Sequence, residues 1–413
     1  MSKKKYGKNW STPVLILNCK IGALAIMRTL GSLGADIYGI DANPKSPELK
    51  SRYLTKYFIK DLDPNNQNDY LEYILAVSKI IGQKAILIPT SDELSVFVAK
   101  NREILKNDFL FPDNSEELLD QLADKQKMFA LAIQESVPTP NIISPQSLAD
   151  VKAAIPEISF PLMLKGIEGN RLLARTGKKM VVVNSESELF EAYEELEDPE
   201  NPNLMLQELI PGDDDQVYIF NGYFNNDSDC LAAFTGHKVR QFPVHVGCAS
   251  LGECRWHEKV AEKTQALMKT VGYKGILDIG YRLDPRDGRY KVLDINPRVG
   301  QAFRIFVAKN NMDVIRSLYL DLTGQEQPEI IPREGRRWLI EDYDFVSSVD
   351  YYKEGSLKFI GWFKSFKNVE EAAWFSWKDP LPFIVKMSRF IAHGFCWGFR
   401  KLKSTITQKT SLH

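Results

Sequence analysis

The segment Leu293-Asp294-Ile295-Asn296-Pro297-Arg298 ends a predicted β-hairpin that spans Gly275–Ile295. Because side chains alternate along a strand, Asp294, Asn296 and Arg298 share one face. Carboxylate and amide oxygens are ligands that Mg²⁺ accepts together with phosphate, and a guanidinium can bind a phosphoryl group through two hydrogen bonds. The pattern predicts a site for a metal-bound polyphosphate. A structural salt bridge is the alternative.

Two lysines upstream of the hairpin occupy positions that suit phosphate binding. Lys125 precedes a predicted helix, and Lys165 ends the apolar strand Phe160–Lys165. Residues at the ends of regular elements hold their charged groups in fixed places, so we expect both ammonium groups to contact phosphate. Taken singly, each is more simply explained as a solvated lysine.

The first part of the chain has the pattern of a doubly wound α/β domain. Val14–Leu17 is a short apolar strand, a helix starts at Gly22, and the strand Ile37–Ile40 ends at Asp41. Such a βαβ start predicts a parallel sheet. A dinucleotide site would need three glycines in the first turn, where this chain has Gly22 alone, so we expect no NAD here.

Taken in order, these segments resemble the ATP-grasp superfamily, in its carboxylate–amine ligase branch (carbamoyl-phosphate-synthase-like and D-aspartate-ligase-like). The resemblance covers residues 12–325 approximately. It implies a chain of mixed α/β and α+β class, in which an ATP-grasp fold follows a doubly wound α/β (pre-ATP-grasp) domain. We expect these two domains at residues 1–112 and 113–328, with an extra C-terminal helical segment at 329–413.

The resemblance also implies a nucleotide site. Lys125 and Lys165 would bind phosphates, and Gly166–Lys178 would be a mobile loop that closes over them. Asp215 has a position where ribose is contacted. The segment Met205–Gly212 resembles the hinge that binds adenine, through Gln207, Glu208, Leu209 and Ile210.

Asp294 and Asn296 would be metal ligands in this resemblance, and Arg298 would bind phosphate in catalysis. The ligand facing Asp294 is expected at position 280, where this chain has Gly280. Asp278 lies two residues earlier on the same face of the strand, and we choose it as the substitute.

Lys238 and Arg240 are predicted to share one strand face, where they could hold an acyl phosphate or a substrate carboxylate. A solvated strand face is the alternative for this pair. Arg304, just after the Asp294–Arg298 motif, is a similar candidate.

The implied reaction joins a small-molecule carboxylate to an amine, with ATP and Mg²⁺ (or Mn²⁺). The substrate carboxylate attacks the γ-phosphate, and the amine then displaces phosphate from the acyl phosphate. An amino acid or small peptide is the expected carboxylate. The rivals are a ligase or kinase with a non-amine acceptor, and a non-catalytic ATP-binding module.

A second possible metal site lies in the segment His245–His257, which contains His245, Cys248, Cys254 and His257. Zinc sites use these residue types in paired spacings. The intervening segment is short, however, and the resemblance places a substrate-facing loop here. We expect polar loop residues in preference to a zinc site.

The composition excludes several classes of protein. The 413 residues include 53 basic and 54 acidic side chains, and this balance argues against nucleic-acid binding through bulk charge. The five cysteines are scattered and odd in number, which favours free thiols. No apolar stretch is long enough for a signal peptide or a membrane span. We expect a cytoplasmic protein of undetermined oligomeric state.

The last part of the chain is aromatic and basic. From Tyr351 onward it has eleven basic and four acidic side chains, a net charge of +7. A helix is expected over Leu381–Lys403, with apolar residues on one side (Phe383, Met387, Phe390, Ile391, Trp397) and basic residues on another (Lys386, Arg389, His393, Arg400). This helix could dock on the body of the protein, contact the inner surface of an anionic membrane, or bind a protein partner.

Overall fold

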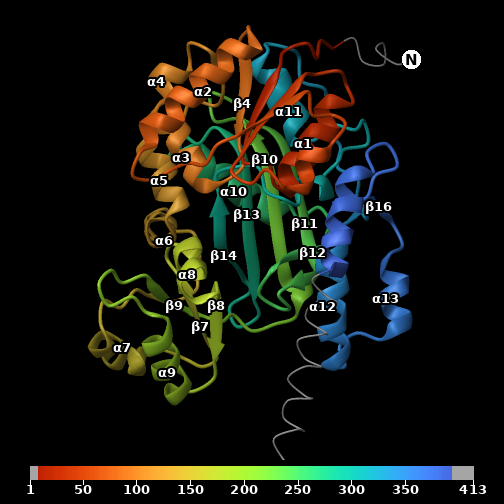
Figure 1. The fold of residues 1–413 in the computed structure, drawn as a ribbon. Helices are drawn as coiled ribbons and strands as arrows, with labels where there is room; N and C mark the ends of the chain where they lie inside the picture. Colours follow the sequence, from red (N-terminus) through yellow and green to blue (C-terminus); the bar gives the residue numbers. More distant parts are fainter. Residues whose placement is uncertain (1–7, 393–413) are drawn as a thin grey trace, which may run out of the picture.

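The computed structural model describes residues 8–392 (Figure 1). In this range the chain forms three β-sheets of five, four and seven strands. Short 3₁₀ turns lie at Pro47–Lys50, Ile155–Glu157, Asp214–Gln216 and Phe303–Ile305.

The five-stranded sheet is parallel, with the order β3-β2-β1-β4-β5. Its strands are β1 (Val14–Leu17), β2 (Ile37–Asp41), β3 (Lys56–Ile59), β4 (Ala85–Pro89) and β5 (Phe109–Leu110). The helices between them are α1 (Ile21–Gly31), α2 (Gln67–Ile81), α3 (Asp92–Lys100) and α4 (Arg102–Leu105). This is the predicted doubly wound arrangement. From β1 the chain first adds strands on one side (β2, β3) and then on the other (β4, β5), so the strand order reverses between β1 and β4. Doubly wound sheets bind ligands in the crevice at such a reversal point.

Burial on both faces explains why β1 is apolar without interruption. Leu15 and Leu17 pack toward α2 and α3, while Val14 and Ile16 pack toward α1 and α11 (Val314–Leu322). The second of these cores continues into the large sheet through Phe234. The α/β part is therefore packed against the part that follows it in the chain.

The four-stranded sheet forms a separate lobe, drawn at the lower left of Figure 1. Its order is β6-β9-β7-β8, all antiparallel. The strands are β6 (Ile142–Ile143), β7 (Leu162–Gly166), β8 (Met180–Val183) and β9 (Leu204–Glu208), and the lobe also holds α7 (Leu148–Ala154) and α9 (Glu186–Leu196). The helices α5 (Glu116–Ala123) and α6 (Lys125–Gln134) lead into it.

The expected loop Gly166–Lys178 is largely helical, which corrects the prediction. Helix α8 spans Gly169–Thr176 and ends at Gly177, whose φ of 73° closes a helix at no steric cost. Leu172 anchors it by packing into the core of the lobe.

The seven-stranded sheet is the largest, with the order β14-β13-β10-β11-β12-β15-β16. Its first five strands are β10 (Val217–Phe224), β11 (Cys230–Phe242), β12 (Cys248–Cys254), β13 (Gly275–Asp284) and β14 (Arg289–Asn296). Helix α10 (Glu258–Val271) packs on it. The predicted hairpin is therefore present as β13 and β14.

The C-terminal part completes this sheet and adds helices. Strands β15 (Arg337–Leu339) and β16 (Val369–Ala372) form its last two strands, and β15 pairs with β12. Helices α12 (Glu341–Lys353) and α13 (Phe359–Ser365) follow β15, and a last helix covers residues 381–392. No helix in the described part of the chain is both long and apolar enough to cross a membrane.

The last helix docks on the body of the protein, which is one of the alternatives left open for Leu381–Lys403. Phe383 and Met387, expected on its apolar side, pack against the core, whereas Ile391 is exposed. Phe390 contacts the Phe345 ring of α12, with ring centroids 6.3 Å apart. The predicted positions His393, Trp397 and Arg400 lie outside the described residues.

Candidate functional site

Three of the predicted metal ligands lie on one face of two paired strands. The antiparallel register of β13 and β14 sets Asp278 opposite Asn296 and Gly280 opposite Asp294. Directly opposed residues point to the same side of a sheet, so the two carboxylates are diagonal neighbours there. The Asn296 Nδ2 donates to the Asp294 carboxylate at Oδ2 and to the backbone carbonyl oxygen of Asp278, each at 3.3 Å.

Asp278 is held in close contact with the loop that follows β14. A Cβ atom at Gly300 would lie 2.4 Å from Asp278 Oδ2, so this position requires glycine. Burial raises the pKa of Asp278 to about 6, and the Arg298 and Lys238 charges oppose that rise. A partly desolvated carboxylate of this kind binds a cation readily once one is present.

Arg298 extends from the same motif to the edge of the parallel sheet. Its Nη2 donates to Asn296 Oδ1 at 2.9 Å, and its Nε lies 2.9 Å from Asp92 Oδ1. Asp92 is the first residue of α3, directly after β4 and its capping Ser91. Sequence reasoning did not single out Asp92, so its place in the site was missed.

The two predicted lysines approach from the small lobe and the helices that lead into it. Lys165, at the end of β7, is 8% exposed, and its Nζ lies 5.4 Å from the centroid of the Phe129 ring on α6. Burial, together with the Lys125 charge, lowers the pKa of Lys165 to about 7. The nearby Asp294 carboxylate opposes that change, which places Lys165 and Asp294 within electrostatic reach of each other.

Lys125 is fixed by the start of α6. Asp124 caps this helix by accepting a hydrogen bond from the Lys127 backbone amide at 2.9 Å. A Cβ atom at Gly169 would lie 3.7 Å from Lys125 Nζ. The ammonium group therefore lies beside the first turn of α8, in the segment predicted to cover phosphates.

The predicted adenine hinge has one polar group free for a ligand. Gln207 is 4% exposed, and its Oε1 has no hydrogen-bond partner within residues 8–392. The register sets Gln207 opposite Met163 and Lys165 opposite Met205, so Gln207 and Lys165 share a face of the lobe. A buried amide without a partner is costly unless a ligand completes it.

Glu208 is already engaged within the protein. Its Oε1 lies 2.5 Å from Arg286 Nη2, and its Oε2 accepts a hydrogen bond from the Asn141 backbone amide at 3.0 Å. These contacts join the lobe to the turn between β13 and β14. In the rest of the hinge, Ile210 is buried and Leu209 is partly buried.

Asp215, predicted near ribose, is exposed and accepts a hydrogen bond from Gln216 at 3.0 Å. The preceding residue, Asp214, makes more contacts. It accepts hydrogen bonds from Gln241 at 3.0 Å and from the Tyr351 hydroxyl. The sequence offered no signal that would have separated these two neighbours.

Known proteins resemble this chain over part of its sequence and over its fold. No protein-family model matches the chain. The D-aspartate ligase of Enterococcus faecium is 24% identical over 248 residues, which cover 57% of this chain and 58% of that protein. The carbamoyl phosphate synthase large chain of Thermus thermophilus is 26% identical over 199 residues, which cover 46% of this chain and 18% of that protein. The chain thus spans less than two thirds of either relative.

Solved structures match over more of the chain. N5-carboxyaminoimidazole synthetase from Staphylococcus aureus, complexed with ADP, superposes with a TM-score of 0.63 at 12% identity, covering 86% of this chain and 89% of that one. The L-amino acid ligase from Bacillus licheniformis gives a TM-score of 0.59 at 15% identity, covering 79% and 78%. The chain has the ATP-grasp fold and is distantly related to these ligases.

Lys238 and Arg240 of this ATP-grasp protein do not act as a pair, which corrects the prediction. Lys238 donates to the Gly247 carbonyl oxygen at 2.8 Å, and the charges that act on its Nζ include those of Asp278 and Asp294. Arg240 is buried. It binds Asp344 of α12 with Nε at 2.7 Å and Nη2 at 3.0 Å. The pairing register shifts between the two residues, so strand alternation does not carry across it.

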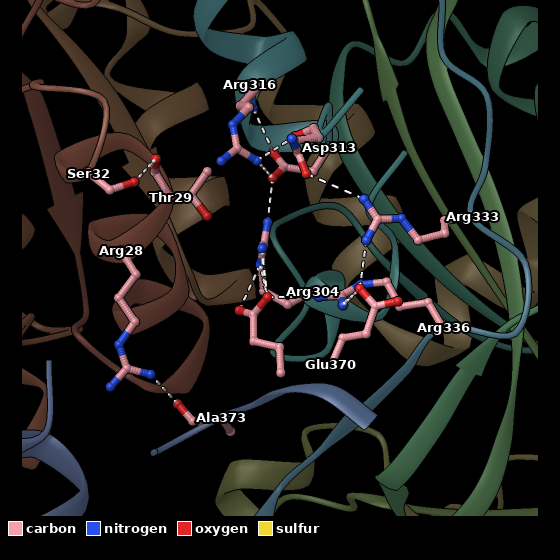
Figure 2. Close-up of polar contacts among 12 residues, drawn as sticks. Arg28, Thr29, Ser32, Arg304, Asp313, Arg316, Arg333, Arg336, Glu370 and Ala373 are labelled. Carbon is pink, nitrogen blue, oxygen red and sulfur yellow. Dashed lines mark hydrogen bonds and ion pairs between the residues drawn. The ribbon is translucent and has the colours of Figure 1, made fainter. Parts of the chain in front are cut away.

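Arg304 is likewise used inside the protein. It lies among Asp313, Arg333, Arg336 and Glu370, as Figure 2 shows. Its Nη1 donates to Asp313 Oδ2 at 2.6 Å. Its Nη2 donates to Glu371 Oε2, also at 2.6 Å. We therefore remove Arg240 and Arg304 from the candidate catalytic residues.

The possible zinc ligands are not gathered. His245 contacts the carboxylates of Asp214 and Glu354, whereas His257 packs against the Tyr218 ring with centroids 4.7 Å apart. Among the described residues, no group of three or more His, Cys, Asp or Glu side chains is arranged to hold a metal ion. This also means that Asp278 and Asp294 would need oxygens from elsewhere to complete a metal site.

Asn221 is a further residue that sequence reasoning missed. It lies on β10 opposite Asp278, is fully buried, and has an Oδ1 atom with no partner within residues 8–392. It therefore adds an unused oxygen acceptor beside the predicted metal ligands.

Proposed function

We propose that this protein is an ATP-dependent carboxylate–amine ligase that works through an acyl phosphate. The observation that carries the proposal is the convergence of opposite charges. Asp278 and Asp294 are diagonal neighbours on the large sheet, and the Asp294 carboxylate lies within electrostatic reach of Lys165 from the small lobe. Such a set can hold a metal-bound triphosphate between the two sheets.

The proposed roles follow from the position of each group. Lys125, Lys165 and Arg298 would bind phosphate oxygens and neutralise the charge that develops on them. Gln207 would satisfy its free Oε1 by accepting a hydrogen bond from the adenine amino group. These groups position the reactants, so the mechanism needs no nucleophilic side chain.

Asp278, Asp294 and Asn296 fit a Mg²⁺ ion by their chemistry, since all three offer oxygen atoms. When bound, Mg²⁺ would supply positive charge to the phosphates. Water and phosphate oxygens would provide its other ligands, as is usual for this ion.

Two bond exchanges make up the reaction. An oxygen of the substrate carboxylate bonds to the γ-phosphorus as the bond to ADP breaks. The amine nitrogen then bonds to the acyl carbon, and phosphate leaves as the amine gives up a proton. Relatives named as ligases of D-aspartate and of L-amino acids support an amino acid as one substrate.

The substrate carboxylate would bind between Arg298 and the reversal point of the parallel sheet. Arg298 contacts Asp92 at the start of α3, and Gly22 in the first turn lies against the loop at Gly300. This crevice adjoins the predicted phosphate site, so it could hold an acceptor oxygen in line with the γ-phosphate.

Release of ADP and phosphate from MgATP, with pooled carboxylates and pooled amines, tests the proposal. We expect turnover only when both pools are present. The Asp294→Asn variant should lose 10²–10³-fold in turnover, on the order expected for one charged group at a phosphoryl transfer site. Asp229→Asn, which changes an exposed carboxylate in the loop between β10 and β11, is the matched control.

Three outcomes would contradict the proposal. Phosphate transfer without amide formation would indicate a kinase-like or non-amine acceptor reaction. ATP binding without turnover across broad pools would indicate a non-catalytic module. Full activity of Asp294→Asn would place the site elsewhere.

A further inference from the structure

Exposed apolar side chains are concentrated in the C-terminal part of the chain. Of the 18 large apolar residues that are exposed in the described range, ten lie between Phe345 and Ile391. Trp377 is 87% exposed and Ile360 is 68% exposed. Isolated exposed apolar residues are common, but a gathering of this size calls for an explanation.

These residues recur at helical spacing, so each helix presents one apolar stripe to solvent. On α12 and on the helix over residues 381–392, the stripes are Phe345, Val349 and Tyr352, and Leu381, Ile384 and Ile391. The opposite sides of both helices face inward, as buried Ser347 and Met387 packing on the core show. The stripes are therefore outer faces of helices that are already docked.

Helix α13 continues the same surface. Phe359, Ile360 and Phe363 are each more than half exposed. The helix is held beside α12 by a 3.1 Å hydrogen bond from Trp362 Nε1 to Asp344 Oδ2. We call the outer faces of α12, α13 and the helix 381–392 the C-terminal apolar surface. Figure 1 shows α12 and α13 on the side of the molecule away from α7 and α9.

The charges around this surface are mostly positive. Lys358, Lys364, Lys367 and Lys378 are exposed and form no ion pair with any described residue. Asp350 and Glu354 of α12 are neutralised by ion pairs with Lys353 and His245, and other acids of this part bind groups in the body of the protein. Glu370 and Glu371 bind the arginine cluster of Figure 2, and Asp379 binds Arg28 at 3.0 Å.

We propose that the C-terminal apolar surface docks on an anionic lipid bilayer. Apolar stripes can enter the boundary between headgroups and acyl chains while the lysines contact anionic headgroups. A second copy of the chain fits less well, because a two-fold interface would bring the same lysines together. Residues 393–413 also fit less well as a cover, since they have four basic and no acidic side chains.

Co-sedimentation of the full chain with vesicles tests this inference. We expect binding to vesicles with about 30% phosphatidylglycerol and little binding to pure phosphatidylcholine. The variant Phe359→Ser/Ile360→Ser/Phe363→Ser should lose roughly tenfold or more in binding. The matched control, Ile80→Ser/Ile133→Ser, changes exposed apolar residues elsewhere and should bind like the parent. Thermal melting of each variant checks that the fold is kept.

Charge reversal gives a second arm. Lys364→Glu should weaken binding to anionic vesicles on the order of fivefold, whereas the control Lys79→Glu should not. Equal binding to neutral and anionic vesicles would overturn the proposal, as would a serine variant that binds like the parent. A stable dimer that binds no vesicle would assign the surface to a second copy.

Discussion

Two charged clusters lie close in the chain but differ in how their charges are balanced. In the candidate site, burial raises the pKa of Asp278 to about 6 and lowers that of Lys165 to about 7, so desolvation outweighs the local partners. In the Arg304 cluster, burial by itself would raise the pKa of the Glu371 carboxyl, as it does for Asp278. The neighbouring arginines outweigh burial there and hold that pKa below its usual value. Charges left incompletely paired in a folded protein mark places where a ligand can complete them, whereas paired charges support the fold.

The first test of this comparison removes an incompletely paired cation. Lys165→Met should reduce phosphate release on the order of 10²–10³-fold under the proposed function, because a group that neutralises phosphate is lost. It should not lower stability, since the folded state no longer has to bury an ammonium group. Turnover assays and urea unfolding measure the two effects. Lys127→Met, which changes an exposed lysine on α6, is the control.

The second test removes a paired cation. Arg304→Met should lower the free energy of unfolding by about 3–5 kcal/mol, because it leaves fully buried Asp313 and partly buried Glu371 short of a partner. Urea unfolding of the full chain measures this change. Lys178→Met breaks an exposed ion pair with Glu195 and should cost no more than about 0.5 kcal/mol. Equal effects of the two substitutions would contradict the distinction between the clusters.

The third test asks whether ionisation of the Asp278 carboxyl lowers the stability of the folded protein. The folded state raises the pKa of Asp278 from 3.8 to about 6, so it binds the proton more tightly than the unfolded state does. Stability should therefore fall as pH rises from about 4 to 6. At pH 8, with EDTA present, Asp278→Asn should be more stable than the parent by about 1–3 kcal/mol.

The same variant should lose metal-dependent turnover, so stability and activity would change in opposite directions. Thermal and urea unfolding between pH 4 and pH 8 would show whether the gain grows from pH 4 to pH 6 and then levels off. A loss of stability at pH 8 would mean that Asp278 is a satisfied structural carboxylate. If the dependence of turnover on Mg²⁺ concentration were unchanged in this variant, Asp278 would not be a metal ligand.

The sequence by itself determined the features that depend on local backbone geometry. Strand alternation placed Asp294 and Asn296 on one face, and the β13–β14 register agrees with it. Apolar runs and the βαβ order predicted the doubly wound sheet, since a strand covered on both faces must be apolar throughout. The motif order also indicated the ATP-grasp fold before any contact was known.

Tertiary structure alone decided which charged side chains are paired inside the protein. Arg240 meets Asp344, which lies 104 residues later in the sequence, and Arg304 meets Glu371, which lies 67 residues later. The register shift beside Arg240 and the inward packing of Phe383 also depend on distant partners. Periodicity fixes the direction of a side chain only relative to its own element. What the side chain meets there depends on how the elements pack, and no local pattern records that.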